Sequence, residues 1–448
     1  MKVLKFGGTS VGSAESIRNV KEIIISQPGS KIVVLSAMSG VTNELVNLVE
    51  YFKLGSRSSQ VEIMERLHQK HKNVIGELFS DSEVKKDTLA QIEQMFGQLQ
   101  EVISRKYDAE LEPVVLTYGE SFLTYIFSKF LEAEEINNTL LDAKDFMHVQ
   151  SLENPNIDIV SDRLEETLKR EIRSEIYITQ GFVRIDRFRN INTLKRGGSD
   201  YSATIIAAAC GAKEVQIWTD IDGFHNNDPR YVENTTALSH LTFEEAAELA
   251  YFGAKILHPQ TVQPVKDRNI PIYLKNTFTP KAAGTKISSE VKSTGLKAIS
   301  AKDGITAIKI KSNRMLMAHG FLRKIFDVFD KHQTAIDMIT TSEIAISLTI
   351  DDIRNLDLIL NELEAYGEIT VEKEHSIICI VGESVIEDKG IYRIFELLND
   401  IPVRMISYGG SKNNISLLVD TRNKIEILKS LNEKLFSPLA PKGGTKTP

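Results

Sequence analysis

The first residues with chemical potential follow the N-terminal apolar run KVLKF at 2–6, where Lys5 is followed by Phe-Gly-Gly-Thr-Ser. Two glycines at the end of a strand let backbone N–H groups approach a ligand closely, and Lys5 adds a full positive charge. Thr9 or Ser10 can cap a following helix, whose free N–H groups and dipole then favour a phosphate. The motif is neither a dinucleotide GxGxxG nor a GxxxxGK[ST] loop, and a tight turn without a ligand explains it equally well.

Two further apolar runs end in polar residues beside a glycine. KIVVLSA at 31–37 leads to Thr42 and Asn43, which could bind a polar substrate group, although Thr42 could equally be a helix cap. PVVLTYG at 113–119 reads as a strand and is followed by Glu120, which could hold an amino group. The simpler interpretation of Glu120 is a surface glutamate at the start of a helix, where the dipole favours acids.

A fourth loop has the sequence RGGSDYSA at 196–203. The planar guanidinium of Arg196 suits a carboxylate, and the two glycines open another helix N-terminus. Asp200 lies in the first turn of that helix, a position that favours an acid in any helix. Arg196 and Asp200 are therefore candidates whose roles need support from the other loops.

A fifth loop, TDIDG at 219–223, follows the apolar run VQIW and precedes DPR at 228–230. Its polar groups could contact a ribose and phosphates, although DxDG can also be only a turn. Lys255 in FGAKILHP is a sixth candidate. Taken together, cationic side chains and glycine-rich turns at strand ends are what phosphoryl transfer needs, and that reaction requires no covalent nucleophile from the protein.

The composition is that of an ordinary globular protein: 448 residues, 42% hydrophobic and 26% charged. This length predicts two or three domains. The net charge of −7 argues against nonspecific binding to nucleic acid. The sequence predicts no membrane span, no signal peptide and no metal site built from cysteine and histidine, so a cytoplasmic enzyme is expected.

The elements that must position these residues alternate between short apolar runs and helical patterns. Runs that are apolar nearly throughout are typical of a parallel sheet covered by helices on both faces. Residues 41–110 are expected to form a helical insertion between the second and third strands, with helices at 44–54, 60–80 and 83–106. The expected strands are 2–6, 31–37, 113–119, 176–182, 215–220 and 270–276.

The chain changes character near residue 280 and then contains a repeat. GFLRKIFDVFD at 320–330 resembles GIYRIFELLND at 390–400, and the segments that follow each of them are also alike. Each unit reads strand–helix–strand–strand–helix, which matches the split βαβ plan of an antiparallel sheet with helices on one face. In the first unit we expect strands near 305–311, 335–341 and 344–350, with helices near 320–332 and 353–366. In the second we expect strands near 376–382, 402–408 and 414–420, with helices near 390–399 and 422–435.

The motif set resembles that of the aspartate kinases, which belong to the amino-acid kinase fold family. The resemblance is carried in order by KFGGTSVG, ITQGF, RGGSDYSA, WTDIDG, DPR and FGAKILHP, and it extends over nearly the whole chain. The C-terminal repeat resembles the paired ACT domains (βαββαβ) of these enzymes, of the monofunctional, lysine-sensitive type. The resemblance implies an α/β kinase domain at 1–285, with ACT domains at 300–374 and 375–440.

The resemblance also implies a reaction: ATP and L-aspartate, with Mg²⁺, give 4-phospho-L-aspartate and ADP. Lys5 would stabilise the transferring phosphoryl group, and Asp200 would organise the lysine. Arg196 and Glu120 would hold the α-carboxylate and α-amino group of aspartate. The substrate pocket would be lined by Thr42, Phe182 and Ser199. The nucleotide would be held by Lys5, Gly7, Gly8, Thr219, Asp220, Arg230 and Lys255, and by His225, where related enzymes often carry a tyrosine.

For regulation, two segments resemble the inhibitor site of lysine-sensitive enzymes. Asp337 and Glu343 supply negative charge that suits a cationic amino acid, and main-chain groups at Gly320–Leu322 would take its carboxylate. Such sites form between two chains, so the resemblance implies a homodimer. The alternative is that these are only loops of a dimerisation domain. The full set implied for the effector is Met315, Gly320, Phe321, Leu322, Asp337, Thr341, Ser342 and Glu343.

Two other functions stay open at this stage. One is another kinase of the same fold, acting on glutamate, acetylglutamate, carbamate or UMP, against which RGGSDY and the double ACT module speak. The other is a catalytically dead, ligand-binding regulatory protein, against which the presence of Lys5, Glu120, Arg196 and Asp200 speaks. The sequence does not decide whether the two ACT units are sequential or interleaved.

Overall fold

The structure is a computed structural model that describes residues 1–80, 82–171, 173–195, 197–253, 256–315, 319–388 and 391–436. It divides into two compact units. The first comprises residues 1–224, 239–243 and 256–290, and the second comprises the described residues of 225–238, 244–255 and 291–448. The predicted boundary at 285 differs from this division, because 225–238 and 244–255 pack with the later part of the chain rather than with the first unit.

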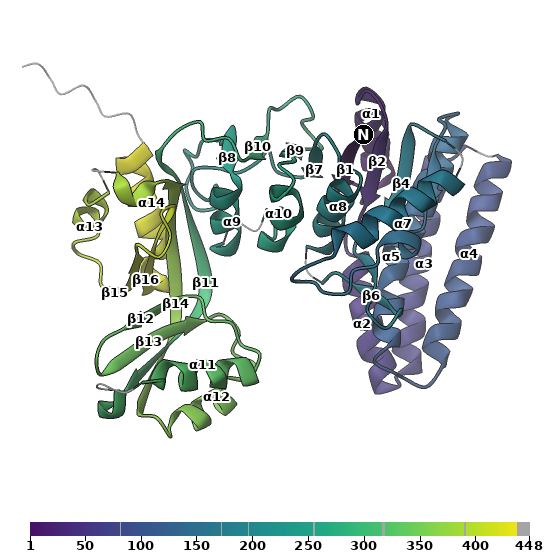
Figure 1. Cartoon of the computed structure of the whole chain (residues 1–448). Coiled ribbons are helices and arrows are strands. Elements are labelled where there is room, and N and C mark those ends of the chain that lie inside the picture. The colour runs from purple at the N-terminus through teal and green to yellow at the C-terminus, as the bar shows by residue number, and fades with distance from the viewer. Residues whose placement is uncertain are drawn as a thin grey trace, which may run out of the picture. The chain divides into compact units, whose positions relative to one another are not determined.

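The first unit is built on one large sheet, shown in Figure 1. In the described part of the chain the strand order is β3-β4-β2-β1-β7-β9-β10-β8, and all neighbours are parallel except β9 and β10. The sequence prediction of a mainly parallel α/β sheet is therefore confirmed. The strands are β1 (Lys2–Phe6), β2 (Lys31–Leu35), β3 (Thr139–Leu141), β4 (Ile176–Gln180), β7 (Val215–Thr219), β8 (His240–Thr242), β9 (Ile272–Asn276) and β10 (Thr285–Ser288).

Alternation along β1 decides where its charged residue points. Leu4 and Phe6 belong to the apolar core that also contains residues of α1 (Ala14–Ser26) and α5 (Leu111–Ala133). Lys5 lies between them and faces the opposite side of the sheet. That side is covered by α8 (Gly198–Ala209), which packs against β1, β2 and β7 and has α7 (Ile157–Arg170) and α10 (Pro259–Lys266) beside it.

Four long helices follow β2, and adjacent helices contact one another. The helices α2 (Val41–Leu54), α3 (Arg57–Leu78) and α4 (Glu83–Ser104) confirm the predicted helical insertion. The fourth helix, α5, replaces the strand predicted at 113–119, so that prediction is wrong. The first unit is completed by α6 (Ala143–Phe146) and by a separate hairpin of β5 (Val183–Ile185) and β6 (Ile191–Thr193).

The second unit contains a six-stranded sheet in the order β12-β13-β11-β14-β16-β15 among the described residues. Its two long central strands each serve both repeats. In β11, Ile305–Lys311 pairs with β13 and the first half of β14, whereas Gly295–Lys302 pairs with the second half of β14. The two repeats are therefore interleaved rather than sequential, and the strand 295–302 begins five residues before the predicted start of the module at 300. The pairing across β11 and β14 supplies the fourth strand that each predicted unit lacked.

Each repeat has its own apolar core. The first centres on Ile308, Ile325 and Leu348, and the second on Ile378, Leu417 and Leu428, with Ile299 from β11 included. No helix in the described ranges has the length and apolar composition needed to cross a membrane. The elements are α9 (Phe243–Tyr251), β11 (Gly295–Lys311), η1 (Asn313–Met315), α11 (Phe321–Lys331), β12 (Ile339–Thr341), β13 (Ala345–Ile350), α12 (Leu356–Leu363), β14 (Glu368–Glu383), η2 (Val385–Glu387), α13 (Arg393–Leu397), β15 (Val403–Tyr408), β16 (Asn414–Asp420), η3 (Thr421–Asn423) and α14 (Lys424–Phe436).

Candidate active site

A cavity of about 360 Å³ in the first unit lies beyond the carboxyl ends of β1, β2 and β4. This is where open parallel sheets bind their ligands. Seven of the site residues that the resemblance implies line it: Lys5, Gly8, Thr42, Glu120, Phe182, Ser199 and Asp200. Loops more than 190 residues apart in the sequence are thus brought to one site by the sheet.

The charged centre of the cavity is an ion pair between Lys5 and Asp200. Lys5 Nζ lies 2.6 Å from Asp200 Oδ1, and only 10% and 14% of the two side chains are exposed. Asp200 is in the first turn of α8, on the side of the sheet toward which Lys5 points. The ammonium group of Lys5, shielded from water in this way, attracts a phosphate that enters the cavity, and the carboxylate of Asp200 offsets part of that attraction. Asp200 fixes the position of the ammonium group.

Glu120 has one unsatisfied oxygen. It lies within α5, and its Oε1 accepts a hydrogen bond of 3.2 Å from the backbone N–H of Ala37. Its Oε2 is buried and has no hydrogen-bond partner among the described residues. Burial raises the pKa of Glu120 to about 8. A ligand with an ammonium group would supply both the missing donor and the charge that stabilises the carboxylate.

The interpretation of Glu120 as a surface residue at a helix start is therefore wrong. It is 3% exposed and lies in the middle of a helix of 23 residues. A buried carboxylate with a free oxygen is costly to maintain, and such groups cluster at functional sites.

Gly119 allows α5 to approach the loop after β2. A Cβ at Gly119 would lie 2.8 Å from Ala37 Cβ and 3.2 Å from two further side-chain atoms. We expect Gly119→Ala to destabilise the protein by about 1–3 kcal/mol through overpacking, and to raise KM for the substrate because Ala37 holds Glu120. Gly97→Ala is the matched control, since α4 has open space there. The control should gain up to about 1 kcal/mol in denaturant unfolding. Equal effects of the two substitutions would contradict this explanation.

The loops after β4 and before α8 interlock around Phe182. Phe182 has a φ of +69°, and its N–H donates a 2.9 Å hydrogen bond to Ser202 Oγ. A Cβ at Gly181 would lie 2.6 Å from Ser199 Cβ, and a Cβ at Gly198 would lie 2.6 Å from the Phe182 ring. Only glycine permits these two approaches, which explains why the ITQGF and RGGSDY motifs occur together. The strained conformation of Phe182 places its ring at the cavity wall.

Two helix N-termini open into the cavity. The N-cap residues Gly40 of α2 and Gly197 of α8 have φ values of +81° and +72° and form no side-chain cap. The first N–H of each helix is already bonded, from Val41 to the carbonyl of Met38 and from Gly198 to that of Lys195, so the N–H groups that follow them are the ones suited to an anion. The helix α1 differs from the prediction, because Ser13 rather than Thr9 or Ser10 caps it, through a reciprocal capping box with Ser16. Ser10 instead forms a 2.6 Å hydrogen bond with Thr277.

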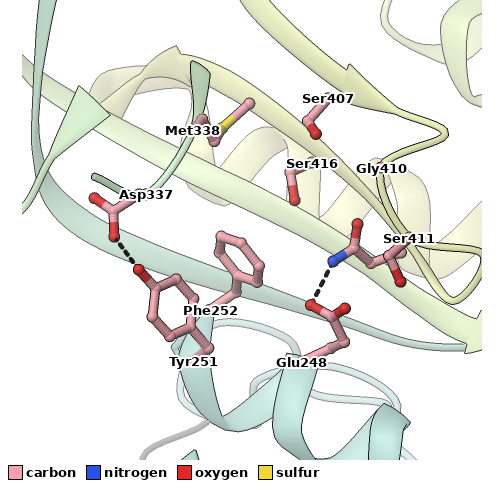
Figure 2. Close-up of a pocket in the computed structure, with 10 residues that line it drawn as sticks. Glu248, Tyr251, Phe252, Asp337, Met338, Ser407, Gly410, Ser411 and Ser416 are labelled. Atoms are coloured by element: carbon pink, nitrogen blue, oxygen red, sulfur yellow. Dashed lines mark hydrogen bonds between the residues drawn. The ribbon is translucent and has the colours of Figure 1, made fainter. Parts of the chain in front are cut away.

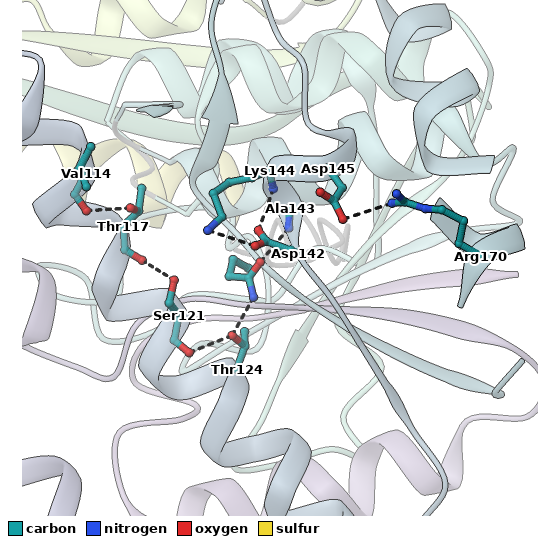
Figure 3. A network of polar contacts seen from close by, with 10 residues as sticks. Val114, Thr117, Ser121, Thr124, Asp142, Ala143, Lys144, Asp145 and Arg170 are labelled. Carbon is teal, nitrogen blue, oxygen red and sulfur yellow. Dashed lines mark hydrogen bonds and ion pairs between the residues drawn. The ribbon is translucent and has the colours of Figure 1, made fainter. Parts of the chain in front are cut away.

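A polar network that includes Thr124 of α5 and Ala143 of α6 lies beside the cavity-forming part of α5 (Figure 3). Gln180, the last residue of β4, donates a 3.0 Å hydrogen bond to Thr124 Oγ1 and accepts one of 2.8 Å from the N–H of Ala143. Thr124 Oγ1 also donates to the carbonyl of Glu120 at 2.8 Å. Gln180 thereby joins α5, one turn beyond Glu120, to the strand that ends just before Phe182.

Comparison with known proteins matches this chain to two families of domains. The model of the amino acid kinase family matches residues 1–276, and an ACT domain model matches residues 378–435. Aspartokinase 1 (chloroplastic) of Arabidopsis thaliana is 33% identical over 97% of this chain and 80% of its own length. The lysine-sensitive aspartokinase 3 of Escherichia coli is 30% identical over 97% and 99%.

This chain belongs to the aspartokinase family. The solved structure of E. coli aspartokinase III in complex with aspartate and ADP aligns with a TM-score of 0.87 at 28% identity, covering 98% of this chain and 100% of that one. The same E. coli protein in complex with lysine and aspartate aligns with a TM-score of 0.81, with the same identity and coverage. These alignments agree with the predicted architecture of an amino acid kinase domain followed by ACT domains.

Several proposed nucleotide residues of this aspartokinase family member do not line the cavity. Thr219 and Asp220 follow β7 and bond to each other, with 3.1 Å between Thr219 Oγ1 and Asp220 Oδ1. His225 and Arg230 belong to the second unit. Gly7 lies beside Lys5, because a Cβ there would be 3.5 Å from Lys5 Nζ. Gly7 does not line the cavity. Arg196 and Lys255 lie outside the described residues.

The cavity contains one cationic side chain that the sequence motifs did not indicate. Lys195 lines the cavity and has a φ of +62°, an unusual value for a residue other than glycine. Its place directly before RGGSDY could have drawn attention to it. The cavity is also lined by Ser36, Ala37, Met38, Ser39, Gly40, Asn43, Gly197 and Gly198, most of them in glycine-containing loops noted from the sequence.

The second unit contains a cavity of about 310 Å³ that has Asp337 in its wall (Figure 2). Asp337 lines it, and Asp337 Oδ1 pairs with Lys302 Nζ at 2.7 Å and with the Tyr251 hydroxyl at 2.9 Å. Asp337 Oδ2 is buried without a partner among the described residues. The cavity is not lined by Met315, Gly320, Phe321, Leu322, Thr341, Ser342 or Glu343.

Proposed function

We propose that this chain transfers the γ-phosphoryl group of ATP to the side-chain carboxylate of L-aspartate, giving 4-phospho-L-aspartate and ADP. The observation that carries the proposal is the pairing, in one cavity, of the Lys5–Asp200 ion pair with the unsatisfied carboxylate of Glu120. The first suits a transferring phosphoryl group and the second suits the amino group of an amino acid. Membership of the aspartokinase family supports the choice of aspartate.

The reaction needs positioning and charge rather than a nucleophile from the protein. An oxygen of the substrate carboxylate attacks the γ-phosphorus, and the bond between that phosphorus and the bridging oxygen breaks to release ADP. Lys5 stabilises the charge on the phosphoryl oxygens, and Asp200 holds Lys5 in place. Glu120 binds the α-ammonium group. Thr42, Phe182 and Ser199 shape the pocket, and Arg196 is proposed for the α-carboxylate.

The nucleotide is proposed to contact Lys5, Gly7, Gly8, Thr219, Asp220, His225, Arg230 and Lys255. The glycine-capped N-termini of α2 and α8 and the ammonium group of Lys5 form a cradle that suits phosphates. Mg²⁺ would be bound mainly through the phosphates of ATP and through water, the usual mode for this ion in kinases. That mode fits the described residues, among which no cluster of three or more ligating side chains was found.

The activity is tested by trapping the acyl phosphate with hydroxylamine in the presence of ATP and a panel of acceptors. We expect product with L-aspartate and none with glutamate or acetylglutamate. Turnover with another acceptor of the panel would assign a different kinase activity to the same fold. Aspartate binding in calorimetry without any turnover would favour the ligand-binding regulatory protein.

We further propose feedback inhibition by L-lysine through a homodimer. Asp337 and Glu343 provide the negative charge, and the first turn of α11 follows Gly320, which forms no side-chain cap with the described residues, so its N–H groups suit a carboxylate. One E. coli relative was solved in complex with lysine and aspartate. In a single chain the cavity is lined by Asp337 and by none of the other effector residues, so the proposal places the complete site at the contact of two chains.

We expect Asp337→Ala to abolish inhibition by lysine while turnover is retained. The incoming ammonium group loses its carboxylate, whereas Lys302 keeps its second partner, Asp351, at 2.8 Å. Initial rates over a lysine titration measure the effect, and Asp357→Ala, an exposed acid of the same repeat, is the control. An unchanged inhibition curve for Asp337→Ala would remove this residue from the effector site.

A further inference from the structure

The residues 225–238, here called the nucleotide arm, carry two of the side chains proposed to hold ATP, His225 and Arg230. The arm has little regular structure: one isolated bridge joins His225 to Ala237, and the N–H of Asn226 donates a 2.9 Å hydrogen bond to the carbonyl of Thr236. The arm also has a turn at Asp228, whose carbonyl accepts from the N–H groups of Tyr231 and Val232, but it contains no helix or strand and so also depends on outside contacts. Those contacts come from the second ACT repeat.

The helix α14 of the second repeat holds the base of the arm. Asn227 is 3% exposed, and its Nδ2 donates hydrogen bonds of 3.0 Å to the carbonyl of Leu428 and 3.3 Å to Asn432 Oδ1. Asn432 in turn donates to the carbonyl of Asn234 at 3.4 Å. Val232 packs into the apolar core of this repeat. The arm is therefore part of the packing of the regulatory repeat.

Lys424, the first residue of α14, reaches the residue next to Arg230. It is 6% exposed, and its Nζ lies 2.7 Å from Asp303 Oδ2 and 4.1 Å from the centroid of the Tyr231 ring. A lysine so little exposed attracts an aromatic ring more strongly than one in water does. Tyr231 follows Arg230 directly in the chain. A contact that holds the Tyr231 ring therefore also restrains the backbone from which Arg230 extends.

The contact between Lys424 and Tyr231 lies next to Arg230 in the chain. Arg230 is 63% exposed at its side chain and forms an ion pair of 2.6 Å with Asp228. The pair presents the guanidinium to solvent in one orientation, as a site for a phosphate requires. Asp228 orients Arg230 directly and begins the turn that carries it, and the contacts of Tyr231 and Asn227 with the second repeat hold this turn in place.

We infer that Lys424 is a positioning residue for the nucleotide: a lysine of the regulatory repeat that sets the conformation of the arm and so the affinity for the phosphates of ATP. The inference rests on the proposed role of Arg230 in nucleotide binding. It gives the second ACT repeat an influence on the affinity for ATP through the arm. An effector that repacks this repeat then has a direct route to the affinity for ATP.

The test is a steady-state comparison of Lys424→Met and Lys424→Arg with Lys429→Met, which changes an exposed lysine of the same helix. We expect Lys424→Met to raise KM for ATP about tenfold, with KM for aspartate unchanged. Lys424→Arg should restore most of the affinity, because a guanidinium can pair with Asp303 and stack on Tyr231. Lys429→Met should behave as the unmodified protein.

Two further variants separate the possible failures. If Arg230→Ala leaves KM for ATP unchanged, the nucleotide role of the arm and the inference both fail. If Arg230→Ala raises it and Lys424→Met does not, the inference alone fails. A parallel rise in both KM values without rescue by arginine would mean general disruption and would also overturn it. Should Lys424→Met not fold, Tyr231→Leu removes the ring and must give the same selective loss.

Discussion

Replacing Lys5 with methionine is expected to lower kcat about a thousandfold, the upper range for loss of one preorganised group that stabilises a transition state. Methionine keeps most of the volume and removes the charge beside Asp200. KM for aspartate should change little, because the amino group is held elsewhere, by Glu120. Single-turnover measurements with ATP would place the loss in the chemical step.

The matched control for this substitution is Lys2→Met in the same strand. Lys2 pairs with Glu214 at 3.0 Å and does not line the cavity. Its loss should leave turnover within about twofold of the unmodified protein, since surface ion pairs contribute little. Both variants should unfold as cooperatively as the parent chain. Unimpaired turnover in Lys5→Met would remove Lys5 from the mechanism.

Replacing Glu120 with glutamine is expected to raise KM for aspartate about a hundredfold, because a buried charged partner of the α-ammonium group is lost. Glutamine retains the acceptor for the N–H of Ala37, so the loop after β2 should keep its place. Glu132→Gln, on an exposed turn of the same helix, is the control. A KM that stays the same in Glu120→Gln would show that the amino group binds elsewhere.

The pH dependence of the same residue has a definite sign. Burial raises the pKa of Glu120 to about 8, so the empty site holds a protonated acid at neutral pH. The substrate ammonium needs the ionised form, so KM for aspartate should fall about tenfold per unit as pH rises from 6 toward 8 and then level off. Glu120→Gln should abolish this slope. A flat profile in the unmodified chain would contradict the assignment.

The same shift affects stability without ligand. The folded pKa is raised above the ordinary value of 4.5, so its contribution to stability is fully present below 4.5 and is lost as pH rises to about 8. Glu120→Gln has no proton to release in the unfolded chain. It should therefore become more stable, relative to the parent, as pH rises through this range. The gain would show that the site is maintained at a cost to the fold.

The sequence predicted the parallel sheet and the kinase motifs because both depend on local patterns. Nearly continuous apolar runs marked the strands, and alternation around Lys5 set its direction once Leu4 and Phe6 were buried. The run at 113–119 was misread for a physical reason. The helix α5 has buried residues on most of its faces, from Val115 to Leu131. Its sequence therefore lacks the polar stripe that would reveal a helical period.

Long-range pairing was beyond the local pattern. The strand β11 continues through 17 residues, and its first half joins a repeat whose other elements lie some 80 residues later. The sequence of residues 295–302 does not indicate which of the two repeats this strand joins. The free oxygen of Glu120 and the dependence of the nucleotide arm on α14 are likewise products of packing. The motifs identified candidate residues, but only the fold shows which of their polar groups are left without partners.

The central claim is that the cavity around Lys5 and Glu120 is where aspartate is bound and phosphorylated. It is tested most directly by a crystal structure of the chain with L-aspartate and a non-hydrolysable ATP analogue. We predict the amino nitrogen of aspartate at hydrogen-bond distance, about 3 Å, from Glu120 Oε2, with its side-chain carboxylate directed toward Lys5. Aspartate bound outside this cavity, or with its amino group away from Glu120, would contradict the claim.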